Sequence, residues 1–396
     1  MKIVFVGPNF YGVGGVEEAT VALASALAKQ GHNITLLSLQ KWGNRPIDKN
    51  INWEIFLDHD DFSLKSKIKR KLPQNSKLYD FLSMDNYVAD NLNPYVINRL
   101  VRHLKNLEAD IVISVRESFH YILNCAQNKK IMQKGYFFHA RPDAYTSLKP
   151  IINNILKKME LGKVLFVTEN LSLALKKEYN YSNYLDSKVL GNTVLQSAIL
   201  DKQMIKQPVK KDNYKGVILT RFSPGKEQDL KNILQAGQSI KNYITSQQKT
   251  KKTISIDLYG GGKYKETFAE QIKQAGLENI LHMKGVATHS GQSNISIIRQ
   301  ADFLADFSSE QSFGMVYLEA ILNGKPVIAS LNSGSKEILQ GMNNYIFTDS
   351  KQIPSKILDF EKLTKLQLQK YYDQIYAKFA PEIVSRRFID FFSDKL

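Results

Sequence analysis

The chain has 396 residues, of which 43% are apolar and 23% are charged, so it is long enough for two domains with separate hydrophobic cores. It contains no apolar run of about 18 residues, which excludes a membrane-spanning helix of ordinary length. The net charge of +16 occurs without zinc-finger spacing, an RNP-type aromatic strand or a helix-turn-helix signal, so we expect no nucleic-acid partner and favour an anionic membrane surface or a phosphate-rich substrate. The single cysteine, Cys125, excludes an internal disulfide, and the short apolar run at the N-terminus is not typical of a signal peptide. We therefore expect a cytoplasmic protein.

The first 40 residues predict a Rossmann-like opening. Residues 3–6 form an apolar run typical of a buried strand, and residues 8–15 form a glycine-rich loop. Residues 16–30 have helical apolar spacing, with Gly31 placed as the residue that ends the helix, and residues 34–39 read as the next strand. Strand, glycine-rich loop, helix and strand in this order are typical of an α/β domain with a parallel sheet.

The glycines of this loop do not form the dinucleotide fingerprint. Gly12, Gly14 and Gly15 give the pattern G-x-G-G, and the second strand ends at Gln40 without an acidic residue for a ribose. The pattern therefore argues against NAD. A loop that approaches a phosphate and a purely structural turn are the two interpretations.

Two charged segments follow. Residues 58–61, Asp-His-Asp-Asp, contain a D-x-D string that could hold a divalent cation, but we interpret them as an acidic loop because so short a pattern recurs by chance. Residues 64–72 carry five cations between apolar residues at helical spacing. Either a solvated helix face or a face that contacts a membrane fits this pattern.

Three further strands are predicted at residues 110–114, 135–140 and 164–168. The second of them contains His139 near its carboxyl end. In an open α/β sheet the carboxyl ends of the strands meet the ligand, so His139 is a candidate site residue. The lysine-rich segment 202–212 is typical of a linker between domains.

A second α/β pattern begins with a strand at residues 216–220, which is followed by Arg221 and Lys226. A guanidinium offers a fork of donors and an ammonium a point charge, which together suit a diphosphate; the alternative is two surface cations. A strand at residues 254–258 then enters a glycine turn, and another follows at residues 280–285.

The chemically richest stretch is a polar loop, residues 308–314, followed by a predicted helix and a strand at residues 327–329. The loop delivers backbone N–H groups and polar side chains to the start of the helix, an arrangement that suits phosphate. Glu319 lies on this helix among apolar residues. Its carboxylate is either solvated or bound to a polar ligand.

This stretch resembles the donor-binding motif of retaining glycosyltransferases with the GT-B fold, those of the family-4 type (glycosyl transferases group 1). The motif has two glutamates separated by seven residues, with Phe-Gly between them and Glu-Ala at its end; Phe313-Gly314 and Glu319-Ala320 match. At the first glutamate position this chain has Gln311, and Glu310 lies one residue earlier.

Other segments resemble the same family in chain order. Arg221 and Lys226 match its Arg and Lys in type and spacing, residues 254–262 resemble its strand and glycine turn, and Gly14-Gly15 resemble its N-terminal glycine loop. The family also carries a histidine at the end of the strand that corresponds to the predicted strand 135–140, in which this chain has His139.

The resemblance implies an α/β GT-B fold with two Rossmann-like domains facing each other across a cleft. Residues 1–200 would form the acceptor domain, residues 201–375 the nucleotide-sugar domain, and residues 376–396 a helix that crosses back to the first domain. The expected activity is transfer of a hexose or N-acetylhexosamine, with retention, from a nucleotide diphosphate sugar, UDP-sugar favoured. The acceptor would be a cell-surface glycan, glycolipid, teichoic acid or glycoprotein, reached in the cytoplasm or at the inner face of the membrane.

The resemblance also assigns roles to residues. Arg221 and Lys226 would stabilise the leaving diphosphate, so no cofactor and no metal is expected. The alternatives are a sugar-nucleotide epimerase and a non-catalytic partner subunit, which the glutamine at position 311 keeps open. The implied site residues are, for catalysis, Arg221, Lys226 and His139; for the donor sugar, Glu310, Gln311, Phe313, Gly314 and Met315; and for the nucleotide, Glu319, Gly15 and Gly285.

Overall fold

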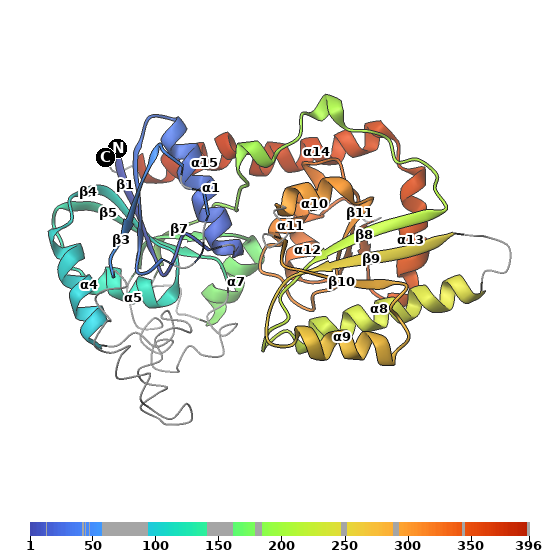
Figure 1. Cartoon of the computed structure of the whole chain (residues 1–396). Coiled ribbons are helices and arrows are strands. Elements are labelled where there is room, and N and C mark those ends of the chain that lie inside the picture. Colours follow the sequence, from blue (N-terminus) through green and yellow to red (C-terminus); the bar gives the residue numbers. More distant parts are fainter. Residues whose placement is uncertain are drawn as a thin grey trace, which may run out of the picture. The chain divides into compact units, whose positions relative to one another are not determined.

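The computed structural model describes residues 1–12, 14–41, 43, 45–46, 48–57, 94–140, 161–178, 184–246, 252–287, 293–342 and 345–393. The chain divides into two compact units. Unit 1 contains residues 1–195 and 381–396, and unit 2 contains residues 196–380 (Figure 1). The acidic segment 58–61 and the basic segment 64–72 lie outside the described residues.

Within the described residues, each unit has one parallel sheet. The seven strands of unit 1 have the order β3-β2-β1-β4-β5-β6-β7, and the six strands of unit 2 have the order β10-β9-β8-β11-β12-β13. All neighbouring strands are parallel. In both sheets the chain moves outward from the first strand and then returns to its other side, which is the strand order of a doubly wound Rossmann fold. The predicted α/β class is confirmed.

The elements of unit 1 are as follows. Its strands are β1 (Lys2–Gly7), β2 (Asn33–Ser38), β3 (Ile51–Ile55), β4 (Ala109–Ser114), β5 (Ile131–Phe138), β6 (Leu161–Phe166) and β7 (Tyr184–Val189). Its helices are α1 (Gly15–Lys29), α4 (Pro94–Asn106), α5 (Glu117–Cys125), α7 (Glu169–Glu178) and α15 (Pro381–Ser393).

The elements of unit 2 follow the same alternation. Its strands are β8 (Asn213–Leu219), β9 (Thr253–Tyr259), β10 (Leu281–Gly285), β11 (Phe303–Asp306), β12 (Val327–Ser330) and β13 (Ile346–Phe347). Its α-helices are α8 (Glu227–Ser246), α9 (Lys265–Gln274), α10 (Asn294–Gln300), α11 (Met315–Ile321), α12 (Ser333–Ile338), α13 (Ile353–Asp359) and α14 (Lys365–Phe379). Short 3-10 turns occur at Gln196–Ala198, Lys202–Met204, Ser350–Gln352 and Phe360–Lys362.

The last helix, α15, is part of unit 1 and packs against α1 (Figure 1). Its apolar face buries Phe388 and Phe392. Gly135 on β5 leaves room for this contact, since a Cβ there would lie 2.7 Å from the Phe392 ring. Gln133 Nε2 donates to the Phe392 carbonyl over 2.6 Å, and Arg387 Nη1 donates to the Leu190 carbonyl over 2.5 Å. Apolar burial and these hydrogen bonds together fix the chain end on the sheet.

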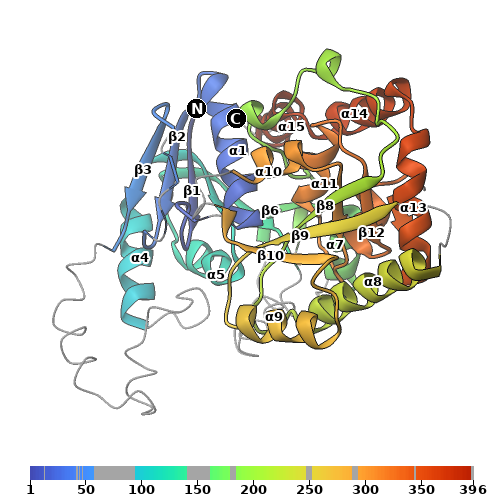
Figure 2. The same cartoon turned by 45° about the vertical axis from the view of Figure 1, so that its right-hand side comes forward.

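Unit 2 is a three-layer structure. Helices α8 and α9 lie on one side of the sheet, and α10 and α11 lie on the other, as both views show (Figures 1 and 2). Strands β11 and β12 at the centre of this sheet are buried on both faces, so they consist of apolar runs such as Val327–Ala329 rather than alternating patterns. Among the helices of the described residues, none is long and apolar enough to cross a bilayer.

Candidate functional site

The sheet of unit 2 has its topological switch point between β8 and β11, where the chain changes direction across the sheet. In doubly wound sheets, ligands bind at the carboxyl ends of the strands at this point. The segment with Arg221 and Lys226 follows β8, and the polar loop 308–314 follows β11. The fold therefore brings the two motifs predicted for the donor to the same edge of one sheet.

A glycine turn after β9 supports the segment with Arg221. Phe222 N donates to the Gly261 carbonyl over 3.0 Å, and Thr220 N donates to the Tyr259 carbonyl over 2.9 Å. A Cβ at Gly260 would lie 1.8 Å from the Thr220 carbonyl oxygen, so only glycine allows this backbone approach. Arg221 itself is exposed at the carboxyl edge of β8.

Lys226 is held by a residue that the sequence reasoning did not single out. Its Nζ lies 2.6 Å from Asp229 Oδ2, and the Asp229 carboxylate is 4% exposed. The other oxygen, Oδ1, accepts hydrogen bonds from the Ser309 backbone N–H over 2.8 Å and from Ser309 Oγ over 2.7 Å. Asp229 therefore ties the two loops of the switch point together while it positions the lysine.

A second buried carboxylate, Asp306, organises the loop after β11. Its Oδ1 accepts from the Ser308 backbone N–H over 3.0 Å and from Ser308 Oγ over 2.5 Å. Its Oδ2 accepts from the Tyr317 hydroxyl over 2.7 Å and from Gln311 Nε2 over 3.2 Å. Burial and the neighbouring Asp306 charge raise the pKa of Tyr317, so the phenol stays a donor. The side chain of Glu310, in contrast, is exposed.

Gly314 begins the helix α11 in a left-handed conformation with φ of +87°. A Cβ there would lie 2.3 Å from the Tyr317 ring, so the turn requires glycine. The Phe313 ring is buried and packs edge-to-face on Phe379 at 5.3 Å, so any ligand contact of Phe313 would come from its backbone. Met315 is half-buried at the first position of α11.

Glu319 is 8% exposed on α11, between buried apolar neighbours, so its carboxylate is not a solvated surface group. Carboxylates are rarely buried in proteins unless they are paired or hydrogen-bonded, so the solvated interpretation of this residue does not hold. Gly285 ends β10 with φ of +80°, and its carbonyl accepts from Gly260 N over 2.7 Å. Nothing lies within 4 Å of a Cβ built on Gly285.

Unit 1 collects polar groups at the matching edge of its own sheet, where the switch point lies between β1 and β4. Gly15 is exposed at the start of α1, and Glu17 in the same first turn pairs with Arg116 Nη2 over 3.3 Å. Arg116 follows β4, so this ion pair joins the loops on the two sides of the switch point.

His139 follows β5 at this edge and is 6% exposed. Its ring packs on Phe137 at 4.1 Å, and neither ring nitrogen has a hydrogen-bond partner among the described residues. Burial, with smaller effects of Arg116 and His120, lowers the pKa of His139 to about 3. His139 is therefore neutral near pH 7, with one donor and one acceptor nitrogen.

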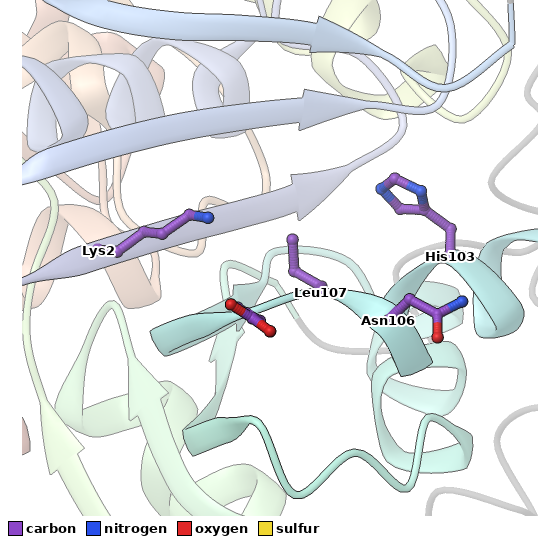
Figure 3. Close-up of a pocket in the computed structure, with 5 residues that line it drawn as sticks. Lys2, His103, Asn106 and Leu107 are labelled. Atoms are coloured by element: carbon purple, nitrogen blue, oxygen red, sulfur yellow. The ribbon is translucent and has the colours of Figure 1, made fainter.

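A surface pocket of about 330 Å³ occurs elsewhere on unit 1 (Figure 3). It is lined by Lys2, His103, Asn106, Leu107 and Glu108. Lys2 is the first residue of β1, so this pocket lies toward the amino edge of the sheet, away from the switch-point edge where ligands of such folds bind. We assign no function to it.

The sequence reasoning found the cations and Glu319 but missed Asp229 and Asp306. The spacing of Lys226 and Asp229 places them one turn apart, which was the available signal for their ion pair. Asp306 ends a short apolar run, and an acidic residue at the carboxyl end of a buried strand in such a sheet was the signal for a site residue.

Comparison with known proteins gives a family and a fold. Residues 201–376 match the family model of glycosyl transferases group 1. A segment is 25% identical over 142 residues to the 2-deoxystreptamine N-acetyl-D-glucosaminyltransferase of Niallia circulans, covering 34% of this chain and 36% of that relative. The chain is also 22% identical over 411 aligned positions to an uncharacterised 42.6 kDa protein from the cps region of Klebsiella pneumoniae, covering 96% and 99% of the two chains.

Solved structures are similar over the whole chain. The lipopolysaccharide outer core galactosyltransferase WaaB in its apo form has a TM-score of 0.64 at 15% identity, with 100% of both chains covered. TarM of S. aureus, in complex with Fondaparinux, α-GlcNAc-glycerol and UDP, has a TM-score of 0.68 at 14% identity, with 99% and 100% covered. HepE of Anabaena, in complex with UDP and glucose, has a TM-score of 0.68 at 17% identity, with 99% of both chains covered.

Two parallel Rossmann-like sheets and the similarity to these structures define the class: this is a protein of the GT-B fold. Its second unit carries the glycosyl transferases group 1 domain, and the chain is a glycosyltransferase. The predicted GT-B fold and the predicted enzyme class are thereby confirmed.

Proposed function

We propose that the protein transfers a hexose or N-acetylhexosamine from a nucleotide diphosphate sugar, with UDP as the favoured nucleotide, and retains the anomeric configuration. One observation carries the proposal: Arg221, Lys226 and the buried carboxylate of Glu319 all lie on segments that follow β8 and β11 at the switch point of unit 2. Two cations suit a diphosphate, and a buried carboxylate suits the two hydroxyls of a ribose.

The choice of donor has support from the solved structures. HepE is described in complex with UDP and glucose, and TarM with UDP. Both have the fold of this chain, and the family model covers the unit that contains these three residues. A UDP-sugar is therefore the first donor to test.

For the acceptor we propose a cell-surface glycan, glycolipid, teichoic acid or glycoprotein. WaaB is named for the lipopolysaccharide outer core, and the Klebsiella relative is named for a cps region. The net charge of +16 would favour an anionic acceptor or an anionic membrane surface.

In the proposed reaction, the bond between the anomeric carbon and the diphosphate oxygen breaks, and the oxygen keeps the electron pair. Arg221, Lys226 and the backbone N–H groups near Gly314 stabilise this charge, so the chemistry requires no metal. The acceptor oxygen bonds to the same face of the anomeric carbon, and its proton passes to the departing phosphate. We propose that neutral His139 contributes a hydrogen bond to the sugar rather than a charge.

The experiment is a panel of nucleotide sugars incubated with the purified chain, with released nucleotide as the readout and NMR of the product anomer as the second. The proposal expects one UDP-sugar to be turned over, and Arg221→Ala to lower that turnover about 100-fold. Lys273→Ala, which removes an exposed cation near the end of α9, is the matched control and should be neutral.

Three results would contradict the proposal in different ways. No turnover of any nucleotide sugar would favour the non-catalytic subunit. Change of the sugar without release of nucleotide would favour an epimerase. An inverted anomer would leave the transferase but remove the retaining mechanism.

A further inference from the structure

Gln311 occupies the position where the family motif has its first glutamate, and the Nε2 atom of its side-chain amide already has two acceptors in the protein. Its Nε2 lies 3.2 Å from Asp306 Oδ2 and 3.2 Å from Ser308 Oγ. A primary amide has two N–H groups, and these two acceptors use both of them. The remaining polar atom of the side chain is Oε1, which can only accept.

The orientation of this amide is fixed by Asp306. A carboxylate has no donor, so a reversed amide would place Oε1 against Asp306 Oδ2 with two acceptors in contact. Asp306 is 7% exposed and is itself anchored, because Ser308 and the Tyr317 hydroxyl occupy its other acceptor positions. The carboxylate therefore cannot turn away to release Gln311 without losing these hydrogen bonds.

We propose that Asp306 is a positioning residue: it orients the Gln311 amide so that only Oε1, an acceptor, is available to a hydroxyl of the donor sugar. Its carboxylate, on the Nε2 side of the amide, also provides the negative charge that a glutamate at position 311 would carry. This proposal rests on the proposed function, because it takes unit 2 to bind a nucleotide sugar. It divides one task between two side chains: Gln311 Oε1 accepts the hydrogen bond, and Asp306 polarises the amide through Nε2.

The pair also explains why glutamine suits this chain at position 311. A glutamate there would put a second carboxylate about as close to Asp306 Oδ2 as Nε2 is now, at 3.2 Å. Two carboxylates at this distance do not both ionise readily, and one of them takes up a proton. Glutamine removes the repulsion and keeps an acceptor at the ligand side.

The test uses D306N, Q311E and the double variant D306N/Q311E, with kcat and KM measured for the preferred nucleotide sugar. D306N leaves the Gln311 amide free to reverse, and Q311E creates the carboxylate pair, so each should lower kcat/KM by about 10- to 100-fold. The double variant restores one carboxylate and one amide in exchanged positions and should recover to within a few-fold of wild type. Recovery in the double variant is a result that a merely structural role of Asp306 does not produce.

Q311E gives a second readout that does not depend on the folding of D306N. Acidification should raise its activity relative to wild type, because protonation of one carboxyl restores a hydrogen bond between the two. Tyr317→Phe removes one anchor of Asp306 Oδ2 but keeps the Gln311 contact, so it should lower kcat/KM less than D306N does.

Losses in the double variant equal to the product of the two single losses, together with no acid recovery of Q311E, would overturn the proposal. Binding of UDP by calorimetry separates this failure from failure of the proposed function. If wild type binds UDP and turns over a donor while rescue is missing, the role of Asp306 alone is wrong. If wild type does neither, the proposed function is wrong.

Discussion

Asp229 joins the loops after β8 and β11, and removing it should affect both stability and catalysis. The carboxylate is 4% exposed and accepts three hydrogen bonds, from Lys226 Nζ, Ser309 N and Ser309 Oγ. Asp229→Ala removes all three. Asp229→Asn keeps an oxygen that can accept from Ser309 but loses the charge that holds Lys226.

The expected loss of unfolding free energy depends on how far the partners of Asp229 are exposed to solvent. Hydrogen bonds to a charged group contribute about 1.5–3 kcal/mol each when buried. The Lys226 side chain is 35% exposed, so solvent screens its share, and we assign that pair no more than about 1 kcal/mol. Asp229→Ala should therefore lower the free energy of unfolding by at least about 3 kcal/mol, and Asp229→Asn by about 1–2 kcal/mol.

Urea unfolding measures the stability, and steady-state kinetics with the preferred donor measures the function. Asp229→Asn, Lys226→Ala and the double variant form a cycle in which the two losses of transition-state stabilisation should fail to add by at least about 1 kcal/mol. Asp302→Asn is the control, since its ion pair with Lys211 precedes β11 at the other edge of the sheet. Additive losses, or tighter UDP binding in Asp229→Asn, would show that Asp229 quenches Lys226 instead of positioning it.

Three further predictions concern the same unit. Glu319→Ala should weaken binding of free UDP in calorimetry by about 10-fold or more, since its proposed target is the ribose; normal binding would remove that role. Activity should survive excess chelator, because Arg221 and Lys226 supply the positive charge; a loss restored by manganese would show that a metal is needed. Gly314→Ala should lower the free energy of unfolding by about 2–4 kcal/mol in urea titration, since it adds a Cβ 2.3 Å from the Tyr317 ring at φ of +87°; an unchanged midpoint would contradict the left-handed turn at the start of α11.

The sequence predicted the alternation of strands and helices well because buried parallel strands are continuous apolar runs. Predicted strands at residues 34–39, 110–114 and 216–220 correspond to β2, β4 and β8 within two or three residues at each end. Gly31, predicted to end the first helix, follows α1 with φ of +86°. These features depend on local physics: burial of a short run and the freedom of glycine at positive φ.

The parts that could not be predicted are those set by long-range contacts. The apolar pattern of residues 382–392 shows that α15 has a buried face, but not that Nε2 of Gln30, the residue after α1, donates to Ser385 Oγ over 2.7 Å. The burial of Glu319 is also set by long-range contacts. A helix of seven residues is too short for its own pattern to reveal that Tyr317, Leu318, Ala320 and Ile321 are all buried around the carboxylate.

The protonation state of His139 also could not be predicted from the sequence, because it is set by the residues that surround the ring in unit 1. His120, which donates to or accepts from Ser114 Oγ over 2.7 Å, also has a pKa lowered to about 3, by burial. Because the folded pKa of His139 is about 3 and its unfolded value is 6.5, the unfolded chain binds more protons between these values. The stability that neutral His139 contributes is therefore fully present above pH 6.5, and the free energy of unfolding decreases as the pH falls from 6.5 toward 3.

His139→Gln should remove one proton from this linkage, so the slope of unfolding free energy against pH should fall by about 1.4 kcal/mol per pH unit between pH 4 and 6. The measurement is urea unfolding at several pH values, with Phe119→Leu as a control that enlarges a core cavity in the same unit without adding or removing a titratable group. The control should lower stability equally at each pH. Equal slopes for wild type and His139→Gln would mean that burial does not lower the pKa of His139 in the folded protein, and the neutral hydrogen-bonding group proposed above would lose its physical basis.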